Sequence, residues 1–272
     1  MAFVTVAEIR YTSGDSNENV SDATITAIEL EVEAEAQRIF NTAFEPTPRI
    51  DVLDGTGTDR ILLDKNPLLS VRSLTTNSTT VTPSYLHLYK EEGKILLGSS
   101  AEAGTFVTDA KSVIVNYLYG LVEKDSTNTT LSTATTAGTS VAMTVASETG
   151  FTANDWVVIY GTDGFEEVAK ISATDTGKLT VDQLVLTHAA SSLIYLLKCP
   201  ARIKRFIEVE SAIRVVTSIL GITSTDIVGY DLGDLRVQKG EAYAQWQRSL
   251  QQLLKEKEEI LKQVKPRFYA TV

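Results

Sequence analysis

His188 is the residue of this chain that could most readily do acid–base chemistry. A serine hydrolase would pair it with an acid such as Asp182. Its nucleophile would be Ser191 or Ser192. Neither serine stands in the Gly-x-Ser-x-Gly turn that exposes such a nucleophile. The sequence therefore favours a turn or core role for His188, and the same role for His87, the other histidine.

Clustered carboxylates suggest a calcium loop around Gly55 and Gly57, where Asp51, Asp54 and Asp59 stand close together. An EF-hand loop needs oxygen ligands two residues apart, a glycine at its sixth position and a glutamate at its twelfth. That spacing is missing. We expect a hairpin turn whose carboxylates face water.

A second acidic group, Asp163 with Glu166 and Glu167, could be taken for the paired carboxylates of a glycosidase. A turn followed by a polar strand face explains it better. The glycine-containing segment 229–234 does not match a phosphate-binding loop, because it lacks that loop's final glycine and its Lys-Ser/Thr pair. No catalytic, metal or cofactor site is therefore expected, and the chain is interpreted as not an enzyme.

Composition limits the partners. The 272 residues carry a net charge of −10, which disfavours gripping nucleic acid through its phosphates. Cys199 is the only cysteine, so an intrachain disulfide is excluded, and with two histidines it cannot form an ordinary zinc site. The N-terminus lacks the pattern of a signal peptide, and nowhere do ~18 apolar residues follow one another. We expect a protein made and used in the cytoplasm, with no membrane contact.

An N-terminal helix is predicted to begin after Ser21, a good capping residue, and to end before Pro46 and Pro48. Its apolar residues recur every three or four positions, while Glu29 and neighbouring glutamates are expected on the surface. The apolar positions are Ile25, Ile28, Val32, Ala36, Ile39 and Phe40.

Strands follow this helix. Alternating apolar residues predict strands around Ile61 and along Val113 to Tyr119, with a turn at residues 54–57 and a hairpin joining 85–89 to 94–97. From about Asp125 the composition shifts to Thr, Ala, Ser, Gly and Val. Five short strand patterns follow there, at 141–145, 156–160, 168–171, 179–181 and 193–197. Regular short strands predict a small barrel or sandwich.

Two helices close the chain. The first is predicted to begin after Pro200 and to stop at Gly221. The second has apolar heptad positions from Tyr243 to Val264 and is expected to stop at Pro266. Its seam can pack within the subunit or against a neighbouring subunit.

The order of these segments carries a resemblance. The run Arg60 to Leu74 leads to a strand that ends Tyr117-x-x-Gly120, and Pro200-x-x-Ile203-Lys204 opens a long helix. A further phrase, Tyr230-x-Leu-Gly-Asp-Leu-x-Val237, stands between the last two helices. This pattern resembles the head-tail connector (adaptor, head-completion) proteins of long-tailed bacteriophages. The present chain departs from that family by placing 79 residues between Gly120 and Pro200.

The resemblance implies an α+β fold: an antiparallel helical bundle with β-hairpins as the core, interrupted by a small all-β barrel or sandwich insert. The expected domains are a discontinuous connector core, 1–124 with 198–272, and an inserted β domain, 125–197. The family resemblance also implies a structural virion protein at the neck, assembled in the host cytoplasm. It would form a homo-oligomeric ring, twelvefold, that docks under the portal, receives the next head-completion or tail protein and lets double-stranded DNA pass through its channel.

Two alternatives stay open at the level of sequence. One is a tail-completion protein at the other end of the same joint. The other is a glycan-binding or hydrolytic tail component that acts through Trp156, Tyr160 and His188 of the insert. Exposed aromatic residues on the insert would favour it.

The C-terminal arm is the expected portal contact. Residues 239–267 hold seven Lys or Arg and four Glu, a net charge of +3 in an acidic chain. A basic arm suits an acidic partner or a neighbour in a ring, and aromatic and Arg side chains are common anchors of such contacts. The predicted portal-contact residues are Trp246, Lys265, Arg267, Phe268 and Tyr269.

Overall fold

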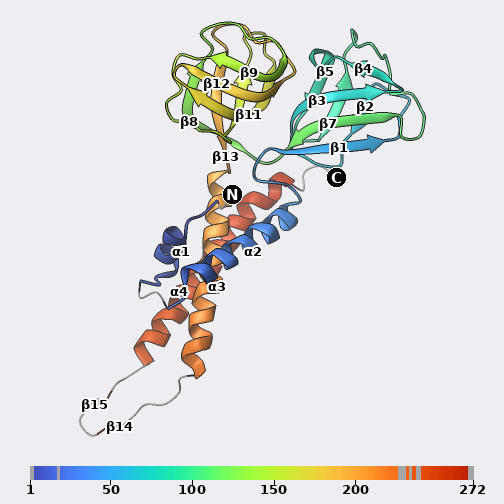
Figure 1. Cartoon of the computed structure of the whole chain (residues 1–272). Helices are drawn as coiled ribbons and strands as arrows, with labels where there is room; N and C mark the ends of the chain where they lie inside the picture. The colour runs from blue at the N-terminus through green and yellow to red at the C-terminus, as the bar shows by residue number, and fades with distance from the viewer. Residues whose placement is uncertain (1–2, 17–18, 226–230, 233–234, 237–239, 269–272) are drawn as a thin grey trace. The chain divides into compact units, whose positions relative to one another are not determined.

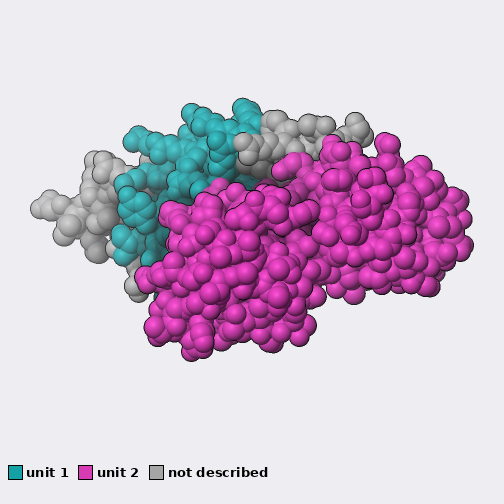
Figure 2. Space-filling view, turned by 90° about the horizontal axis from the view of Figure 1, so that it is seen from above, with its two compact units in different colours: residues 1–40, 201–272 teal, residues 41–200 magenta. Residues whose placement is uncertain are grey.

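The computed structural model describes residues 3–16, 19–225, 231–232, 235–236 and 240–268, with side chains left out at 221–244 and from 264 onward. The fold is α+β, with strands in the middle of the chain and helices at both ends (Figure 1). The chain divides into two compact units, residues 1–40 with 201–272 and residues 41–200, coloured separately in Figure 2. No helix in the described ranges is long and apolar enough to span a membrane.

The first unit begins with two helices. Helix α1 (Val6–Ser13) starts at a capping box, in which the Thr5 side chain and Glu8 bond each other's backbone N–H groups, and ends at Gly14 with φ 77°. Helix α2 (Asp22–Phe40) begins after Ser21, as predicted. The residues that begin and end α1 are therefore ones that the sequence analysis did not use.

Helix α2 confirms most of its predicted stripe but not all of it. Ile25, Val32, Ala36 and Phe40 are buried, whereas Ile39 is exposed. The expected surface position of Glu29 is wrong, since only 2% of it is exposed. Glu29 lies four residues from Ile25 and three from Val32, so the helix turns it onto the buried face.

Helices α3 (Ala201–Thr225) and α4 (Gly240–Phe268) form a long hairpin, and β14 (Asp231–Leu232) pairs with β15 (Leu235–Arg236) between them (Figure 1). Both predicted ends were too early. The helix α3 continues one turn past Gly221, since a glycine weakens a helix without ending it. The helix α4 runs two residues past Pro266, because the ring fixes a helix-compatible φ and the lost hydrogen bond falls in the last turns.

The seam between α3 and α4 is apolar. The buried α3 residues Val209, Ala212, Ile213 and Val216 pack with Leu253, and the half-buried Trp246, Leu250 and Ile260 of α4 join them. Arg205 bonds both carboxylate oxygens of Glu256, and Lys257 pairs with Glu210 at 2.7 Å. The predicted heptad stripe of α4 is thus filled within the subunit, at least along the residues that the structure describes.

The second unit opens with two antiparallel sheets that share one core. The first has the order β1 (Thr47–Leu53), β7 (Val113–Tyr119), β3 (Leu68–Thr76), β4 (Thr79–Val81). The other has the order β2 (Arg60–Leu62), β6 (Lys94–Leu97), β5 (Leu86–Tyr89), with a short 3₁₀ turn, Pro83–Tyr85, before β5. The predicted 85–97 hairpin and the inward face of β7 are confirmed, with Tyr117 and Phe106 fully buried in this core. The hairpin turn expected at 54–57 is wrong, because β1 pairs with β7 and β2 pairs with β6, so residues 54–57 connect two different sheets.

The remaining strands of this unit form one six-stranded sheet around a core of its own. Its order is β8 (Glu123–Thr130), β13 (Leu193–Lys198), β10 (Trp156–Tyr160), β11 (Glu166–Asp175), β12 (Lys178–Leu184), β9 (Gly138–Thr144). The five predicted strands are present, and β8 is an addition to them. The expected barrel is wrong for the described residues, and the expected sandwich stays a prediction. The sheet bends at a bulge in β11 near Ile171 and Ala173, and a single bridge from Leu131 to Val145 does not amount to closure by strand pairing.

The six-stranded sheet packs against the first sheet of the same unit. Leu118 of β7 is fully buried and lies in one cluster with Val158 and Val168 of the insert. Arg72 donates to Asp182 at 2.6 Å across the same joint. The structural grouping of 41–200 thus differs from the domains expected at 1–124 with 198–272 and at 125–197, and independent folding of 125–197 stays a prediction.

Candidate functional site

His188 lies inside the six-stranded sheet, where its side chain is fully buried. Its Nε2 is 3.0 Å from Glu167 Oε2, and the same carboxylate accepts the backbone N–H groups of Val185 and Leu186. The predicted core position of His188 is confirmed. The pair ties β11 to the loop after β12.

The other members of the weighed hydrolase triad lie elsewhere. Asp182 accepts hydrogen bonds from Arg72 and from the backbone N–H of Lys170. Ser192 donates to the carbonyl of Ala189 at 2.7 Å. Glu167 therefore takes the place beside His188 that Asp182 would need, and neither the acid nor Ser192 is arranged for nucleophilic attack.

The aspartates near Gly55 turn toward different partners. Asp54 accepts the backbone N–H of Lys111 at 2.7 Å, while Asp59 pairs with the neighbouring Arg60. The expected solvated position of Asp51 is wrong, because this residue is only 4% exposed. Among the described residues, no three His, Cys, Asp or Glu side chains are placed to hold a metal ion.

Asp51 is the centre of a buried polar network. It accepts hydrogen bonds from the Tyr117 hydroxyl at 2.7 Å, from Arg49 Nε at 2.6 Å and from the backbone N–H of Asp64 at 3.1 Å. Burial opposes the charged carboxylate, but these donors outweigh burial and hold the pKa of Asp51 below its usual range. Burial, followed by the hydrogen bond to Asp51, raises the pKa of Tyr117. The network fixes β1, β7 and the segment after β2 to one another.

The three carboxylates weighed as a glycosidase pair serve separate purposes. Asp163 accepts the backbone N–H of Phe165 within a turn. Glu166 forms an ion pair with Lys90, and Glu167 holds His188. Because Glu166 and Glu167 are neighbours on a strand, they point to opposite faces. They cannot flank one glycosidic bond.

The aromatic residues proposed for glycan binding by the insert lie in its joint with the first sheet. Trp156 and Tyr160 are half-buried and pack around Leu118, Val158 and Val168. Tyr160 also meets Lys124, whose Nζ is 3.8 Å from the ring centre. These rings do not offer the exposed stacking surface that the alternative required.

The predicted portal-contact residues are only partly described. Trp246 packs into the α3–α4 seam and is half-buried. The side chains of Lys265, Arg267 and Phe268, and the whole of Tyr269, lie outside the described residues. The outward face of α4 carries the exposed cations Arg248, Lys255 and Lys262, together with the exposed Glu258 and Glu259.

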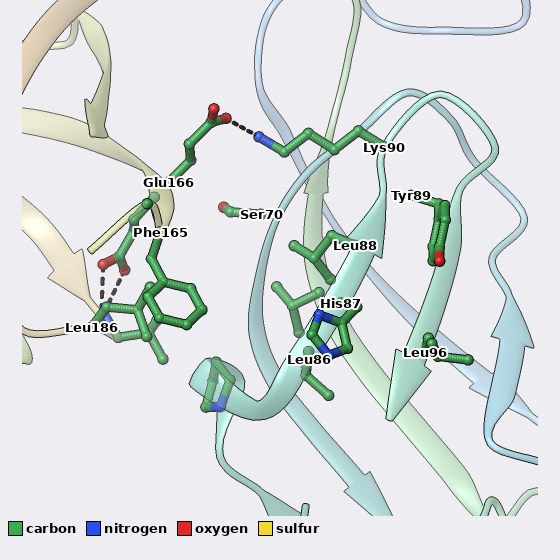
Figure 3. Close-up of a pocket in the computed structure, with 15 residues that line it drawn as sticks. Ser70, Leu86, His87, Leu88, Tyr89, Lys90, Leu96, Phe165, Glu166 and Leu186 are labelled. Atoms are coloured by element: carbon green, nitrogen blue, oxygen red, sulfur yellow. Dashed lines mark hydrogen bonds and ion pairs between the residues drawn. The ribbon is translucent and has the colours of Figure 1, made fainter. Parts of the chain in front are cut away.

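The second unit contains a cleft of 710 Å³, which the sequence analysis did not anticipate (Figure 3). One wall is formed by β5 with Ser70 of β3, and the other by residues 164–167 and 185–186 of the six-stranded sheet. These segments lie far apart in the sequence. No pattern of spacing could have joined them, because the cleft depends on how the two sheets pack.

Comparison with known proteins adds no relative: no protein-family model matches the chain, and no curated protein matches it.

Proposed function

We propose that this chain is a structural protein of the bacteriophage virion, a head-tail adaptor. In this proposal identical subunits form a closed ring, twelvefold, at the neck of the particle. The ring docks under the portal, receives the next head-completion or tail protein and lets DNA pass through its channel. The subunit works without a cofactor and catalyses no reaction.

The observation that carries this proposal is the way the family-like sequence is interrupted. Strand β7 ends at Tyr119 directly before Gly120, and helix α3 begins at Ala201 directly after Pro200. Between them, residues 123–198 form a sheet with its own apolar core. The finer expectation, a connector core of helical bundle and β-hairpins interrupted by an insert, is part of the same proposal.

The surface of the helices supports assembly into a ring. The α3–α4 seam is filled within the subunit, so contacts between subunits need other apolar residues. Leu30 of α2 is 53% exposed and Leu254 of α4 is 42% exposed. Exposed leucines on two helices of one unit are suitable for burial against neighbouring subunits.

The charge distribution supports the proposed partners. A net charge of −10 is compatible with DNA that moves past the protein without binding to it. The outward face of α4 carries three exposed cations, Arg248, Lys255 and Lys262, against two exposed anions, Glu258 and Glu259, a small positive excess for contact with a portal protein.

Electron microscopy of virions, or of portal complexes mixed with the purified chain, tests the location. We expect density for this chain as a ring at the neck between portal and tail. A matched sample that lacks the chain should lack that ring and should contain heads without tails. Density at the tail tip instead would reject the adaptor function.

Deletion of residues 266–272 tests the docking arm. The deleted chain should remain folded but lose binding to portal rings in a pull-down. A control chain in which Gly and Ser replace residues 267–272 keeps the length and removes the side chains. Both variants should fail alike, since we assign the contact to Arg267, Phe268 and Tyr269 together with Trp246 and Lys265. Undiminished binding by either variant would move the docking surface elsewhere, for instance to α2.

A further inference from the structure

The 710 Å³ cleft has a size typical of small-molecule sites, which hold roughly 300–1,000 Å³. Its two walls are held together by the ion pair of Lys90 on β5 with Glu166 on β11 (Figure 3). The buried cluster around Leu118 fixes the same two sheets to each other. The cleft is therefore formed before any ligand arrives.

One wall presents an aromatic ring. Phe165 is 37% exposed, and its ring lies in the space between the two walls in Figure 3. The turn that carries it is closed by a hydrogen bond from Gly161 N–H to the Phe165 carbonyl, and Gly164 adopts φ 87° within it. The turn itself therefore holds Phe165 in place, and one side of its ring faces the cleft, where a ligand could pack against it.

This wall is also rigid at its base. The Glu167 carboxylate accepts the backbone N–H of Leu186 at 3.0 Å and is itself only 3% exposed. Leu186 lines the cleft beside Phe165. The base of the wall therefore moves with the core of the sheet.

The opposite wall contains a buried hydroxyl that lacks a partner. Ser70 is 4% exposed, and no residue in the described part of the chain is hydrogen-bonded to its Oγ. In Figure 3 the Ser70 side chain points into the cleft, between Glu166 and Leu88. Leaving such a hydroxyl unpaired is costly, so a ligand oxygen that reaches it would be favoured.

These features select the chemistry of the ligand. A purely apolar ligand would leave the Ser70 hydroxyl without a hydrogen bond and would take the Lys90–Glu166 ion pair out of water. An anionic ligand would meet the Glu166 carboxylate, with Lys90, already paired with it, as the only Lys or Arg among the residues that line the cleft. A ligand with an apolar ring face and several neutral hydroxyl groups meets every requirement.

We propose that the cleft binds one neutral pyranose unit of a carbohydrate. The C–H face of the sugar packs on Phe165, one hydroxyl bonds Ser70 Oγ, and others bond Lys90 and Glu166. This is a binding function with no bond made or broken. It is independent of ring formation, since every contributing residue lies in residues 41–200 of one subunit.

Saturation-transfer NMR and calorimetry on the full purified chain test the proposal, with glucose, galactose, mannose and N-acetylglucosamine as probes. We expect saturable binding of at least one sugar with a Kd on the order of 1 mM, the range expected for a ligand this small. N-acetylneuraminic acid, which carries a carboxylate, should bind more weakly than the best neutral sugar.

Two variants locate the site. Phe165→Ala should weaken binding ~10-fold through loss of the stacking surface, and Ser70→Ala should weaken it roughly 5-fold through loss of one hydrogen bond. Tyr11→Ala is the matched control, because Tyr11 is an exposed aromatic residue of α1, outside residues 41–200. It should leave the Kd unchanged. Circular dichroism of Phe165→Ala should match the parent chain, since the side chain lies at a surface turn.

Three results would overturn the proposal: no saturable binding of any neutral sugar, unchanged affinity in Phe165→Ala, or preference for the acidic sugar. None of them bears on the adaptor function. A ring at the neck could still be observed with an empty cleft, and a sugar-binding chain could still be absent from the neck.

Discussion

Gly120 occupies a position that only glycine can fill without strain. Its φ is 147°, and a Cβ placed there would lie 2.6 Å from the Glu45 carbonyl oxygen. Its N–H donates to the Pro67 carbonyl, and the next N–H, of Leu121, donates to Ala43. This residue closes the family-like strand phrase, so a sequence feature and a backbone requirement coincide here.

Gly120→Ala should therefore destabilise the second unit. We expect a loss on the order of 1–3 kcal/mol, from a strained φ and from a close approach to rigid backbone. Urea unfolding measures it. Gly104→Ala is the matched control, because a Cβ at Gly104 meets nothing within 4 Å, and it should be neutral or slightly stabilising. Equal effects of the two changes would contradict the assignment.

Glu29 is a second residue whose role depends on burial. Phe3 N–H donates to one carboxylate oxygen at 3.3 Å, and the other oxygen has no hydrogen-bond partner in the described chain. Burial raises the pKa of Glu29 above its usual range. The folded state therefore holds this proton more tightly than the unfolded state, and the associated stability is lost as the pH rises through the raised pKa.

Glu29→Gln should stabilise the chain at neutral pH, because it removes the buried charge. We expect a gain on the order of 1 kcal/mol, or about 2–4 °C in Tm, for a protein of this size. Below pH ~4, where Glu29 is protonated, the gain should disappear. Thermal melts at pH 7 and at low pH measure it, with Glu258→Gln on the exposed face of α4 as the control. A gain that is independent of pH would point to a cause other than charge.

At the scale of the element, the long periodic segments were predictable and their ends were not. Three of four helices and most strands followed from apolar spacing. Helix α1 was missed although Thr5 and Glu8 carry the capping-box signal, because eight residues hold too few apolar positions to show a period. Strand β8 was missed because its Thr, Asn and Ser residues look like a loop, and it forms because β13 offers it a partner.

The candidate site was the least predictable part. Ser70 and Phe165 lie 95 residues apart in the sequence, and neither has a neighbour pattern that marks a site. Glu167 and His188 were noticed as separate candidates, but their pairing depends on the register of β11 and on the loop that follows β12. Contacts of this kind are set by packing between sheets and not by local spacing.

Two adjacent leucines of the α3–α4 hairpin allow the effect of a substitution on folding to be distinguished from its effect on assembly. Leu253 is 6% exposed in the seam, whereas Leu254 is 42% exposed. Leu253→Ala should cost about 2–5 kcal/mol, as expected for a buried leucine, and Leu254→Ala should change stability by less than about 0.5 kcal/mol. Urea unfolding of the isolated chain compares them.

The Leu254→Ala variant also tests whether this residue contributes to contacts between subunits of the proposed ring. Leu254→Ala should weaken assembly on portal complexes, measured by sedimentation, although the free subunit is intact. Normal assembly of that variant would exclude Leu254 from the subunit contact.

At the scale of the whole molecule, the sequence analysis did not anticipate how closely residues 123–198 are attached to the first sheet of the same unit. The joint buries Leu118 completely and holds two ion pairs, Arg72 with Asp182 and Lys90 with Glu166. An apolar residue of β7 is covered only because the insert is present. The change in composition near Asp125 indicated a separate segment. It could not indicate that this segment covers Leu118 of the neighbouring sheet.

Replacing residues 125–197 with a short Gly/Ser linker is expected to leave a helical chain that aggregates, because Leu118 and Leu69 become exposed. The same truncation with Leu69→Thr and Leu118→Thr should be soluble. Size-exclusion chromatography and circular dichroism compare the two. If the simple truncation is already soluble and monomeric, the joint contributes little. If both variants unfold, the insert is part of one folding unit with the host sheets.

The first and last strands of the insert are hydrogen-bonded neighbours, with Glu123 opposite Lys198 in antiparallel register. This arrangement has a mechanical consequence. A tension applied to the chain at Leu121 and Pro200 would separate β8 from β13 one pair at a time, starting at Glu123, and would not load all the pairs at once as in shear. The insert should therefore open at low force and lengthen the chain while the sheets outside it stay intact. In the proposed adaptor ring, a load on the chain would extend this segment before its host fold breaks.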